Sequence, residues 1–195
     1  IVNLRIPGYG ASRLGEDQDD YDATTVAQMF YQHFEDSYDV LAIVPHDDHL
    51  APYAAFHSTL KNEVSGIGQP LVDDSASYGS AGRLKAYELY LNASVTDNAT
   101  SSHETAHQWG SYFDWTTLTG MVRAGSQAEA HSPLWAAGET LMAGLLEPTR
   151  RLDVVDGAWQ VVRTPRLARF HPFMKYAMGI IPADAVPEVT LFDEQ

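Results

Sequence analysis

The sequence predicts an α+β fold, and three observations support this prediction. The first half of the chain contains several short apolar runs typical of strands. Two further segments carry the apolar spacing of helices, and the second half is rich in loops with only short regular segments. Strands and helices do not alternate regularly along the chain, which argues against a doubly wound parallel sheet.

The strands expected in the first half are short. Most are bounded by turn residues: Pro7-Gly8 ends the first, and Pro45 ends an apolar run that has the composition of a buried strand. Two weaker signals fall within the irregular stretch 46–83, and the last run leads into a helix. The expected strands are residues 1–6, 38–44, 54–56, 66–72 and 86–91.

Two helices are expected beside these strands. The first covers Ala23–Asp36, where apolar side chains recur with helical spacing. The second contains residues 103–107 and follows a stretch rich in capping residues, with Asn98 or Thr100 as the expected N-cap. In this second helix, an apolar stripe beside the histidines is expected to face the core; its members are Ala106, Trp109, Gly110 and Phe113.

The second half is expected to contain three short regular segments. Part of 134–146 is predicted to be helical, and residues 153–163 are predicted to form a strand or hairpin around Asp156-Gly157. Pro172–Met178 is expected to form a short helix before Gly179.

Length and composition favour a single domain over 1–195, with two small domains as the alternative. The chain has 195 residues, of which 45% are hydrophobic, enough to bury one substantial core. No run of about 18 apolar residues occurs, so no membrane span is expected. The chain lacks cysteine, which leaves His, Asp and Glu as metal ligands. It begins at Ile1 without Met or a signal-like segment, as expected for a mature or excised part of a larger secreted chain.

The charge of the chain argues against nucleic acid as a partner. The formal net charge is −14, and the only lysines are Lys61, Lys85 and Lys175. We interpret this charge as a solubility feature, with steering of cationic substrates as the alternative. An acidic loop, Gly15–Asp22, is a weak candidate for a structural Ca²⁺, although it lacks the spacing of an EF-hand.

The most informative stretch is His103-Glu104-Thr105-Ala106-His107, which reads H-E-x-x-H. Two histidines four apart on a helix share one face, about 6 Å apart at Cβ, so both imidazoles can bind one Zn²⁺. Glu104 can then act as general base towards a water that the metal activates. The alternative is a histidine-bearing surface helix with a salt-bridging glutamate. The motif predicts a zinc site with Glu104 as its catalytic residue.

Catalytic zinc usually takes three protein ligands, and the third is expected to be His131. Residues 120–130 can return the chain towards the helix. Two alternatives stay open: Asp114, which requires the helix to break at Gly110, and Glu139.

The other histidines have weaker claims. His46 and His49 lie in an acidic stretch that could bind a surface metal, although a solvated loop is the simpler interpretation. Structural roles are expected for His33, His57 and His171.

Residues 103–110, His-Glu-Thr-Ala-His-Gln-Trp-Gly, resemble the active-site helix of the zincin superfamily of zinc metallopeptidases. In the metzincin pattern Gly110 matches, but Phe113 stands where the third histidine is expected. Residues 141–144 resemble a methionine turn that would place Met142 beneath the metal, with a core methionine as the alternative. The chain is also similar to bacterial secreted zincin-like domains, which share the His-Glu-x-x-His-x-Trp-Gly helix and a segment like Tyr176–Pro182.

The resemblance implies a zincin-like fold, in which a mixed sheet packs on the active-site helix, and a secreted, periplasmic or cell-surface location in bacteria. The resemblance does not establish a substrate; together with the motif, it makes a zinc-dependent endopeptidase acting on proteins or peptides the leading hypothesis. Tyr176 is a candidate hydrogen-bond donor to the substrate, with a core tyrosine as the alternative, and the strand near 66–72 is a candidate edge for an extended peptide. The functional alternatives are a catalytically idle zinc-bearing domain that binds a surface protein or glycan, and a zinc amidase acting on cell-wall peptides.

Overall fold

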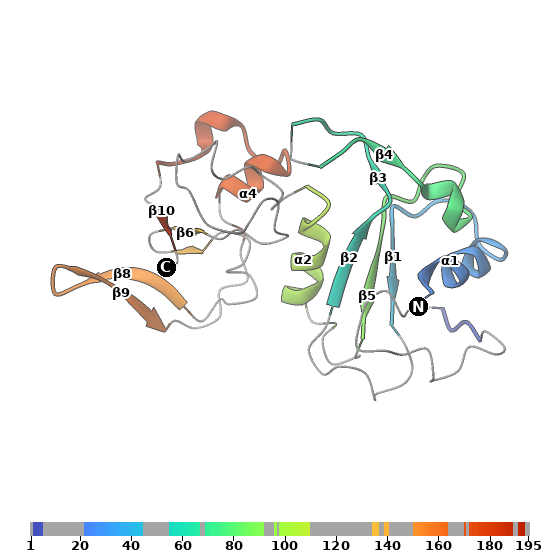
Figure 1. Ribbon diagram of the computed structural model, residues 1–195, viewed down its shortest axis with the longest axis horizontal. Coiled ribbons are helices and arrows are strands. Elements are labelled where there is room, and N and C mark those ends of the chain that lie inside the picture. The colour runs from blue at the N-terminus through green and yellow to red at the C-terminus, as the bar shows by residue number, and fades with distance from the viewer. Residues whose placement is uncertain are drawn as a thin grey trace. The chain divides into compact units, whose positions relative to one another are not determined.

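A computed structural model describes residues 2–5, 22–44, 55–66, 69–91, 96, 98–109, 134–136, 139–140, 150–163, 170, 172–188 and 191–193. The chain groups into two compact units, one of residues 1–64 and 70–108 and the other of residues 65–69 and 109–195. Both units combine helices and strands, so the α+β class is confirmed at this level (Figure 1).

A three-stranded mixed sheet is the centre of the first unit. Its middle strand is β5 (Ala86–Tyr90), which pairs in parallel with β1 (Val40–Ile43) and antiparallel with β2 (Ala55–Thr59). Every residue of β5 is buried, whereas the two outer strands are mostly half-buried. The predicted strands at 38–44 and 86–91 are confirmed, and the weak signal at 54–56 corresponds to the start of β2.

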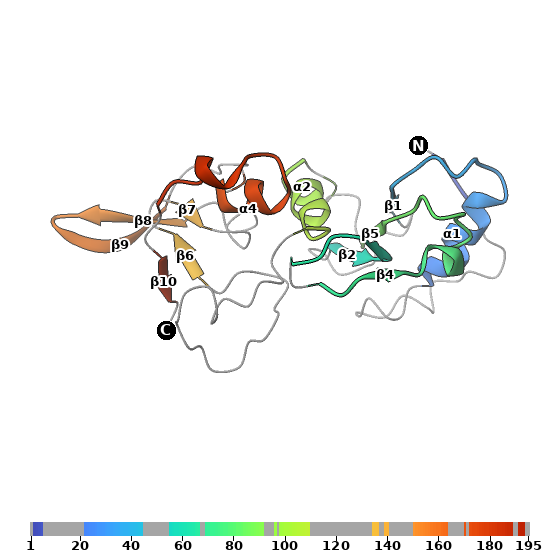
Figure 2. The ribbon, with the colours of Figure 1, turned by 90° about the horizontal axis from the view of Figure 1, so that it is seen from above.

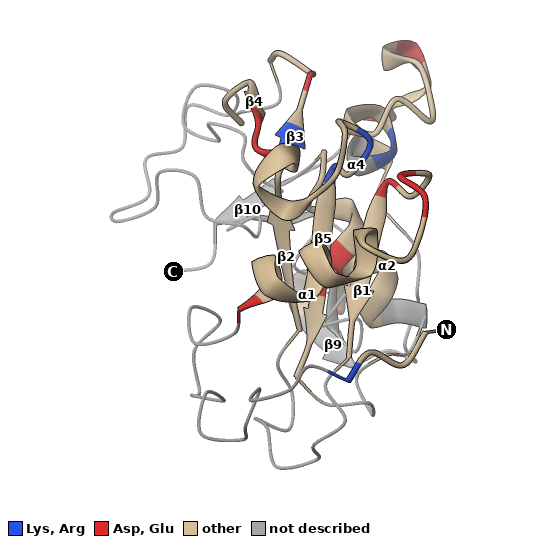
Figure 3. Cartoon of the chain, turned by 90° about the vertical axis from the view of Figure 1, so that its right-hand side faces the viewer, with Lys and Arg blue, Asp and Glu red and all other residues tan. Residues whose placement is uncertain are grey.

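One face of this sheet carries the apolar core, and α1 (Ala23–Tyr31) covers it. Alternate residues of β5 and its extension point to this face because side chains alternate along a strand. The view with α1 in front of the three strands is shown in Figure 3. The buried residues of this core are Ala23, Ile43, Leu60, Leu84, Tyr87, Leu89 and Leu91.

Helix α1 begins where the sequence predicts but ends earlier, at Tyr31 rather than Asp36. Asp22 caps its start by accepting a hydrogen bond from the backbone N–H of Thr25 at 2.9 Å. Beyond the helix, the Asp36 carboxylate accepts bonds from the Ser80 hydroxyl and from the backbone N–H of Ala81. The apolar periodicity of 23–36 could not predict this early end, because the Asp36 side chain binds a loop from another part of the chain.

A short hairpin and a turn complete the first unit. Strands β3 (Lys61–Asn62) and β4 (Val72–Asp73) pair antiparallel, and the 3₁₀ helix η3 (Ser75–Tyr78) follows. Gly79 then adopts a positive φ of 83°, and a Cβ there would lie 3.2 Å from Gln28 Cα of α1. This close approach explains why glycine occupies the position. The peptide-binding role expected for residues 66–72 stays a prediction.

The second unit contains two small sheets and one helix. Strands β6 (Leu134–Ala136), β7 (Glu139–Thr140) and β10 (Leu191–Asp193) form one sheet, in the order β10-β6-β7. Strands β8 (Arg150–Val155) and β9 (Ala158–Arg163) form a hairpin, visible as the two long orange strands in Figure 2. Helix α4 (Pro172–Ala177) matches its prediction, and the 3₁₀ helix η6 (Ala183–Ala185) follows.

The β8–β9 turn confirms the hairpin predicted around Asp156-Gly157. Both turn residues have positive φ, 52° for Asp156 and 79° for Gly157. Two successive left-handed residues are the requirement of the type I′ turn that suits a two-residue hairpin, and Asp-Gly is one of its preferred pairs. The Asp-Gly pair was therefore sufficient to predict this hairpin, because the turn depends only on neighbouring residues.

Three predicted elements differ from the structure over their described residues. Residues 2–5 have no regular secondary structure, although alternation predicted a strand over 1–6. The strand expected at 66–72 is wrong for most of its length, because Gly66 and residues 69–71 have no regular secondary structure and only Val72 belongs to a strand, β4. Part of 134–146 was expected to be helical; its described residues form strands β6 and β7, because β6 pairs with β10, which lies more than fifty residues later in the chain, and residues 141–146 lie outside the described residues. Among the described residues, no helix has the length and apolar character that a membrane span requires.

Candidate metal centre

Helix α2 (Asn98–Ala106) carries the H-E-x-x-H motif, and this helical placement agrees with the prediction. It begins at Asn98, so Asn98 and Thr100, the two expected caps, both lie in its first turn. The helix closes in a tighter turn, where the N–H groups of His107 and Gln108 donate to the carbonyls of Glu104 and Thr105. His107 therefore lies one turn beyond His103 although the regular helix has ended.

The two histidines of the motif point their Nε2 atoms at each other. These nitrogens lie 3.2 Å apart, and the ring planes meet at 88° with centroids 4.7 Å apart. Both residues are buried, His103 completely and His107 to within 5%. Two imidazole nitrogens this close either share the N–H hydrogen of one ring or bind a common cation.

The donor set suits a zinc ion. Two nitrogens that each lie about 2.0–2.1 Å from a tetrahedral zinc are about 3.3–3.4 Å apart, close to the separation of the His103 and His107 nitrogens. Both donors are imidazole nitrogens, and neutral imidazole is a common ligand of zinc. Among the described residues, however, no group of three or more His, Asp or Glu side chains is arranged to hold a metal.

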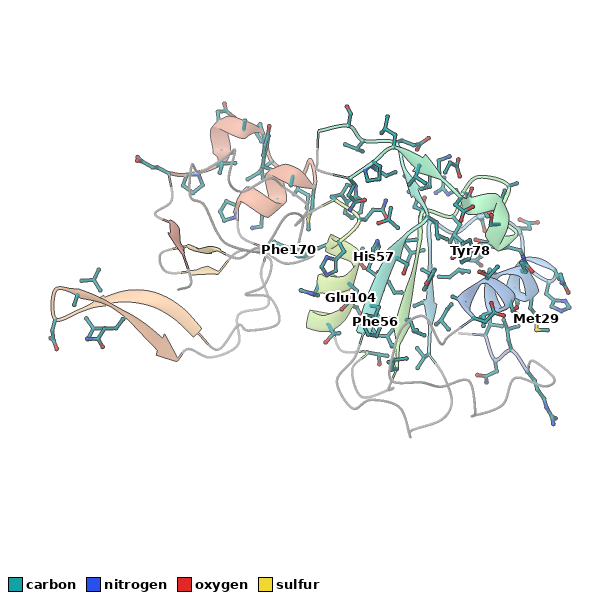
Figure 4. All side chains as sticks on the ribbon, viewed as in Figure 1. Met29, Phe56, His57, Tyr78, Glu104 and Phe170 are labelled. Atoms are coloured by element: carbon teal, nitrogen blue, oxygen red, sulfur yellow. The ribbon has the colours of Figure 1, made fainter. Side chains whose placement is uncertain are left out.

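Glu104 follows the first histidine in the chain and is almost fully buried, with 3% of its surface exposed. Figure 4 labels its side chain on α2. Burial raises the pKa of Glu104 to about 7, and the negative charge of Glu88 contributes to the same rise. A carboxyl with a pKa near neutrality can both accept and release a proton under physiological conditions.

A second glutamate, Glu88 of β5, lies in the layer between the sheet and α2. Its carboxylate accepts hydrogen bonds from the hydroxyl of Tyr90 at 2.5 Å and from the hydroxyl of Thr105 at 2.6 Å. Burial alone would raise the pKa of Glu88, but the contacts with His57, Thr105 and Tyr90 outweigh it and hold the pKa below its usual value. Glu88 is therefore a charged group in the protein interior.

His57 of β2 connects this carboxylate to the end of α2. Its Nδ1 lies 3.9 Å from Glu88 Oε1, and its Nε2 lies 3.2 Å from Gln108 Oε1. The Gln108 amide in turn donates to the carbonyl of Lys61 at 2.9 Å. Because Gln108 Oε1 can only accept, His57 Nε2 carries the proton of this bond. The His57 ring is also near the metal candidates, with its centroid 6.3 Å from that of His107.

The face of α2 that meets the sheet is therefore polar as well as apolar. Of the apolar stripe expected on this helix, Ala106 is buried and Trp109 half-buried, while Gly110 and Phe113 lie outside the described residues. Thr105 and Gln108, three residues apart, make the hydrogen bonds that join the helix to the strands. The apolar pattern did not predict these contacts.

The structure brings together three of the four predicted site residues, His103, Glu104 and His107. His131 lies outside the described residues, as do Asp114 and Met142. Glu139 contributes its backbone to β7, and its side chain is not described. Tyr176 lies on α4 in the second unit and is 45% exposed, so it is not a buried core tyrosine.

The remaining histidines are placed only in part. His33 is exposed in the turn after α1, whereas His46, His49 and His171 lie outside the described residues, as does the acidic loop 15–22. The structural role predicted for His57 agrees with its buried side chain and its hydrogen bond to Gln108.

Sequence reasoning did not single out Glu88, although a signal was present. Glu88 is the one charged residue in the otherwise apolar run Ala86–Leu91, which was itself correctly predicted as a strand. A charge within a strand buried on both faces requires compensating partners, so it indicates a polar contact with another element.

Comparison of the chain with models of known protein families, with curated proteins and with solved structures found no match.

Proposed function

We propose that this protein is a zinc-dependent endopeptidase in which His103, His107 and His131 bind the metal and Glu104 is the general base. The observation that carries the proposal is the convergence of the two Nε2 atoms to 3.2 Å beside a buried glutamate. A surface helix with a salt-bridging glutamate does not account for this arrangement, because both histidines and Glu104 are buried and no cationic side chain pairs with Glu104 among the described residues.

The roles of the residues follow from their chemistry. Zinc, when bound, would polarise the substrate carbonyl and acidify a water molecule. Glu104 would remove a proton from the attacking water and pass it to the nitrogen of the departing amine. The pKa of Glu104 is about 7 in the metal-free protein, and a nearby cation would lower it and favour the ionised form that accepts a proton.

The zinc proposal is tested by metal analysis and by one substitution. The purified protein should contain one zinc per chain, and Glu104→Gln should retain it while losing peptide hydrolysis, by about 10²-fold or more. The matched control is Glu63→Gln, because Glu63 is a glutamate with 65% of its side chain exposed. Full hydrolysis of a casein substrate by Glu104→Gln would remove this residue from the mechanism.

The third ligand is tested by comparing the zinc content of His131→Ala, Asp114→Ala and Glu139→Ala. Only His131→Ala should lose the metal, because imidazole is the ligand type that completes a three-histidine site. Loss in one of the other two variants instead would reassign the ligand.

Substrate comparison separates the functional alternatives. An endopeptidase should cleave extended peptides, an amidase should cleave only cell-wall peptides, and an idle binding domain should retain zinc without hydrolysing either. Zinc retention without hydrolysis would contradict the proposed enzyme and leave the metal site in place.

A further inference from the structure

The buried carboxylate of Glu88 accepts hydrogen bonds from two hydroxyl groups that belong to different elements. The Tyr90 hydroxyl comes from the same strand, two residues away, and binds Glu88 Oε2. The Thr105 hydroxyl comes from α2 and lies 2.6 Å from Glu88 Oε1 and 2.9 Å from the carbonyl oxygen of Ser101; the carboxylate is the nearer acceptor of its one hydrogen. One bond therefore stays within β5, whereas the other joins the central strand of the sheet to the helix of the metal candidates.

Thr105 occupies a special place on this helix, midway between the two histidines in sequence and opposite to them in space. At about 100° per residue, it lies about 160° around the axis from His103 and from His107. Holding Thr105 against the sheet therefore determines the direction in which both imidazoles point. A rotation of the helix about its axis would move both Nε2 atoms.

The bond is strong for its kind because its acceptor is a buried charge. Glu88 is 4% exposed, and hydrogen bonds to an ionised carboxylate in the interior are about twice as strong as neutral ones. Helix α1 is held against the sheet by apolar contacts. At Thr105, by contrast, α2 contacts the strand through a polar group.

We propose that Glu88 is a positioning residue, which through Thr105 sets the rotation of α2 and so the geometry of the His103–His107 pair. This inference rests on the proposed zinc function. Groups that orient metal ligands from outside the coordination shell contribute about 10–100-fold to metal affinity.

Two substitutions distinguish positioning from a structural role, because each removes one hydroxyl from the same carboxylate. Thr105→Val keeps the shape of the side chain and removes the bond between strand and helix. Tyr90→Phe removes the bond within β5 and the contact of the Tyr90 phenol with Ser101, but it leaves the bond between Thr105 and the strand in place. Both variants leave Glu88 short of one donor, so both should lower the melting temperature of the metal-free protein to a similar extent.

The readout is the dissociation constant for Zn²⁺, measured by competition with a chromophoric chelator, together with the visible absorption spectrum of the Co²⁺-substituted protein. We expect Thr105→Val to bind Zn²⁺ about 10-fold or more weakly and to alter the Co²⁺ spectrum. Tyr90→Phe should match the wild type in both, and Thr105→Ser, which keeps a hydroxyl, should recover most of the affinity.

Thr105→Val is expected to remain folded because the hydrogen bonds of Gln108 with His57 and with the Lys61 carbonyl also hold the end of α2. Equal zinc affinities for Thr105→Val and Tyr90→Phe would overturn the inference while leaving the zinc site intact. A wild-type protein that binds no zinc would instead overturn the proposed function, and the inference with it.

Discussion

Two buried glutamates in the first unit have opposite environments, and each environment explains the pKa of its carboxyl group. Glu88 receives two hydroxyl donors and lies near the His57 ring, so its charge is compensated. Glu104 is buried beside that charge, so its pKa rises to about 7. Environments that separate the pKa values of two neighbouring acids are typical of sites that move protons.

At the residue scale, Tyr31 gives a pH-dependent prediction that is independent of any metal. Burial, followed by the charge of Asp36, raises the pKa of the Tyr31 phenol from 10.0 to about 12. Above pH 10 the unfolded chain releases this proton while the folded protein keeps it. The stability that Tyr31 contributes is therefore complete below pH 10 and is lost as the pH rises towards 12.

Between pH 8 and pH 11, the free energy of unfolding of Tyr31→Phe should therefore fall less than that of the wild type, and the difference between the two decreases should be about 1 kcal/mol. Urea unfolding at both pH values measures the difference, and the ionisation of the other tyrosines is common to both proteins. Equal losses in the two proteins would show that the environment of the phenol does not raise its pKa.

At the scale of elements, the two helices of the first unit are held by different kinds of contact. Helix α1 packs against apolar side chains of the sheet and has a capped start, so both its position and its first residue were predictable from local sequence. Helix α2 is joined to the sheet through Thr105 and Gln108. Its existence followed from its motif, but the residues that orient it could not be identified from apolar spacing.

The start of α1 gives a second stability prediction. Asp22→Ala removes the acceptor for the Thr25 N–H and should lower the free energy of unfolding by about 1 kcal/mol. Asp22→Asn keeps a side-chain oxygen and should lose less. The measurement is urea unfolding at neutral pH; an alanine variant as stable as the wild type would mean that water replaces the cap without cost.

At the scale of the whole molecule, charge is the property that the sequence states most directly. A net charge of −14 makes the chain repel itself, and salt screens such repulsion. We expect the melting temperature to rise by a few degrees between about 10 mM and 500 mM NaCl at neutral pH. Near the isoelectric point the effect should vanish, and an equal salt response there would assign it to something other than net charge.

The sequence by itself determined those features that depend on residues close together in the chain. The pairing of His103 with His107 follows from the pitch of a helix, and the β8–β9 hairpin follows from the conformational freedom of Asp156-Gly157. The central strand β5 could be predicted because its apolar run, interrupted only by Glu88, is typical of burial on both faces.

Only the tertiary structure decided which distant residues meet. The hydrogen bond from Thr105 to Glu88, seventeen residues apart, and that between His57 and Gln108, fifty-one apart, depend on how α2 packs against the sheet. The strand at 134–136 likewise owes its conformation to a partner near the end of the chain, not to its own periodicity. Local propensity favours a conformation, but long-range pairing supplies the free energy that selects among the alternatives.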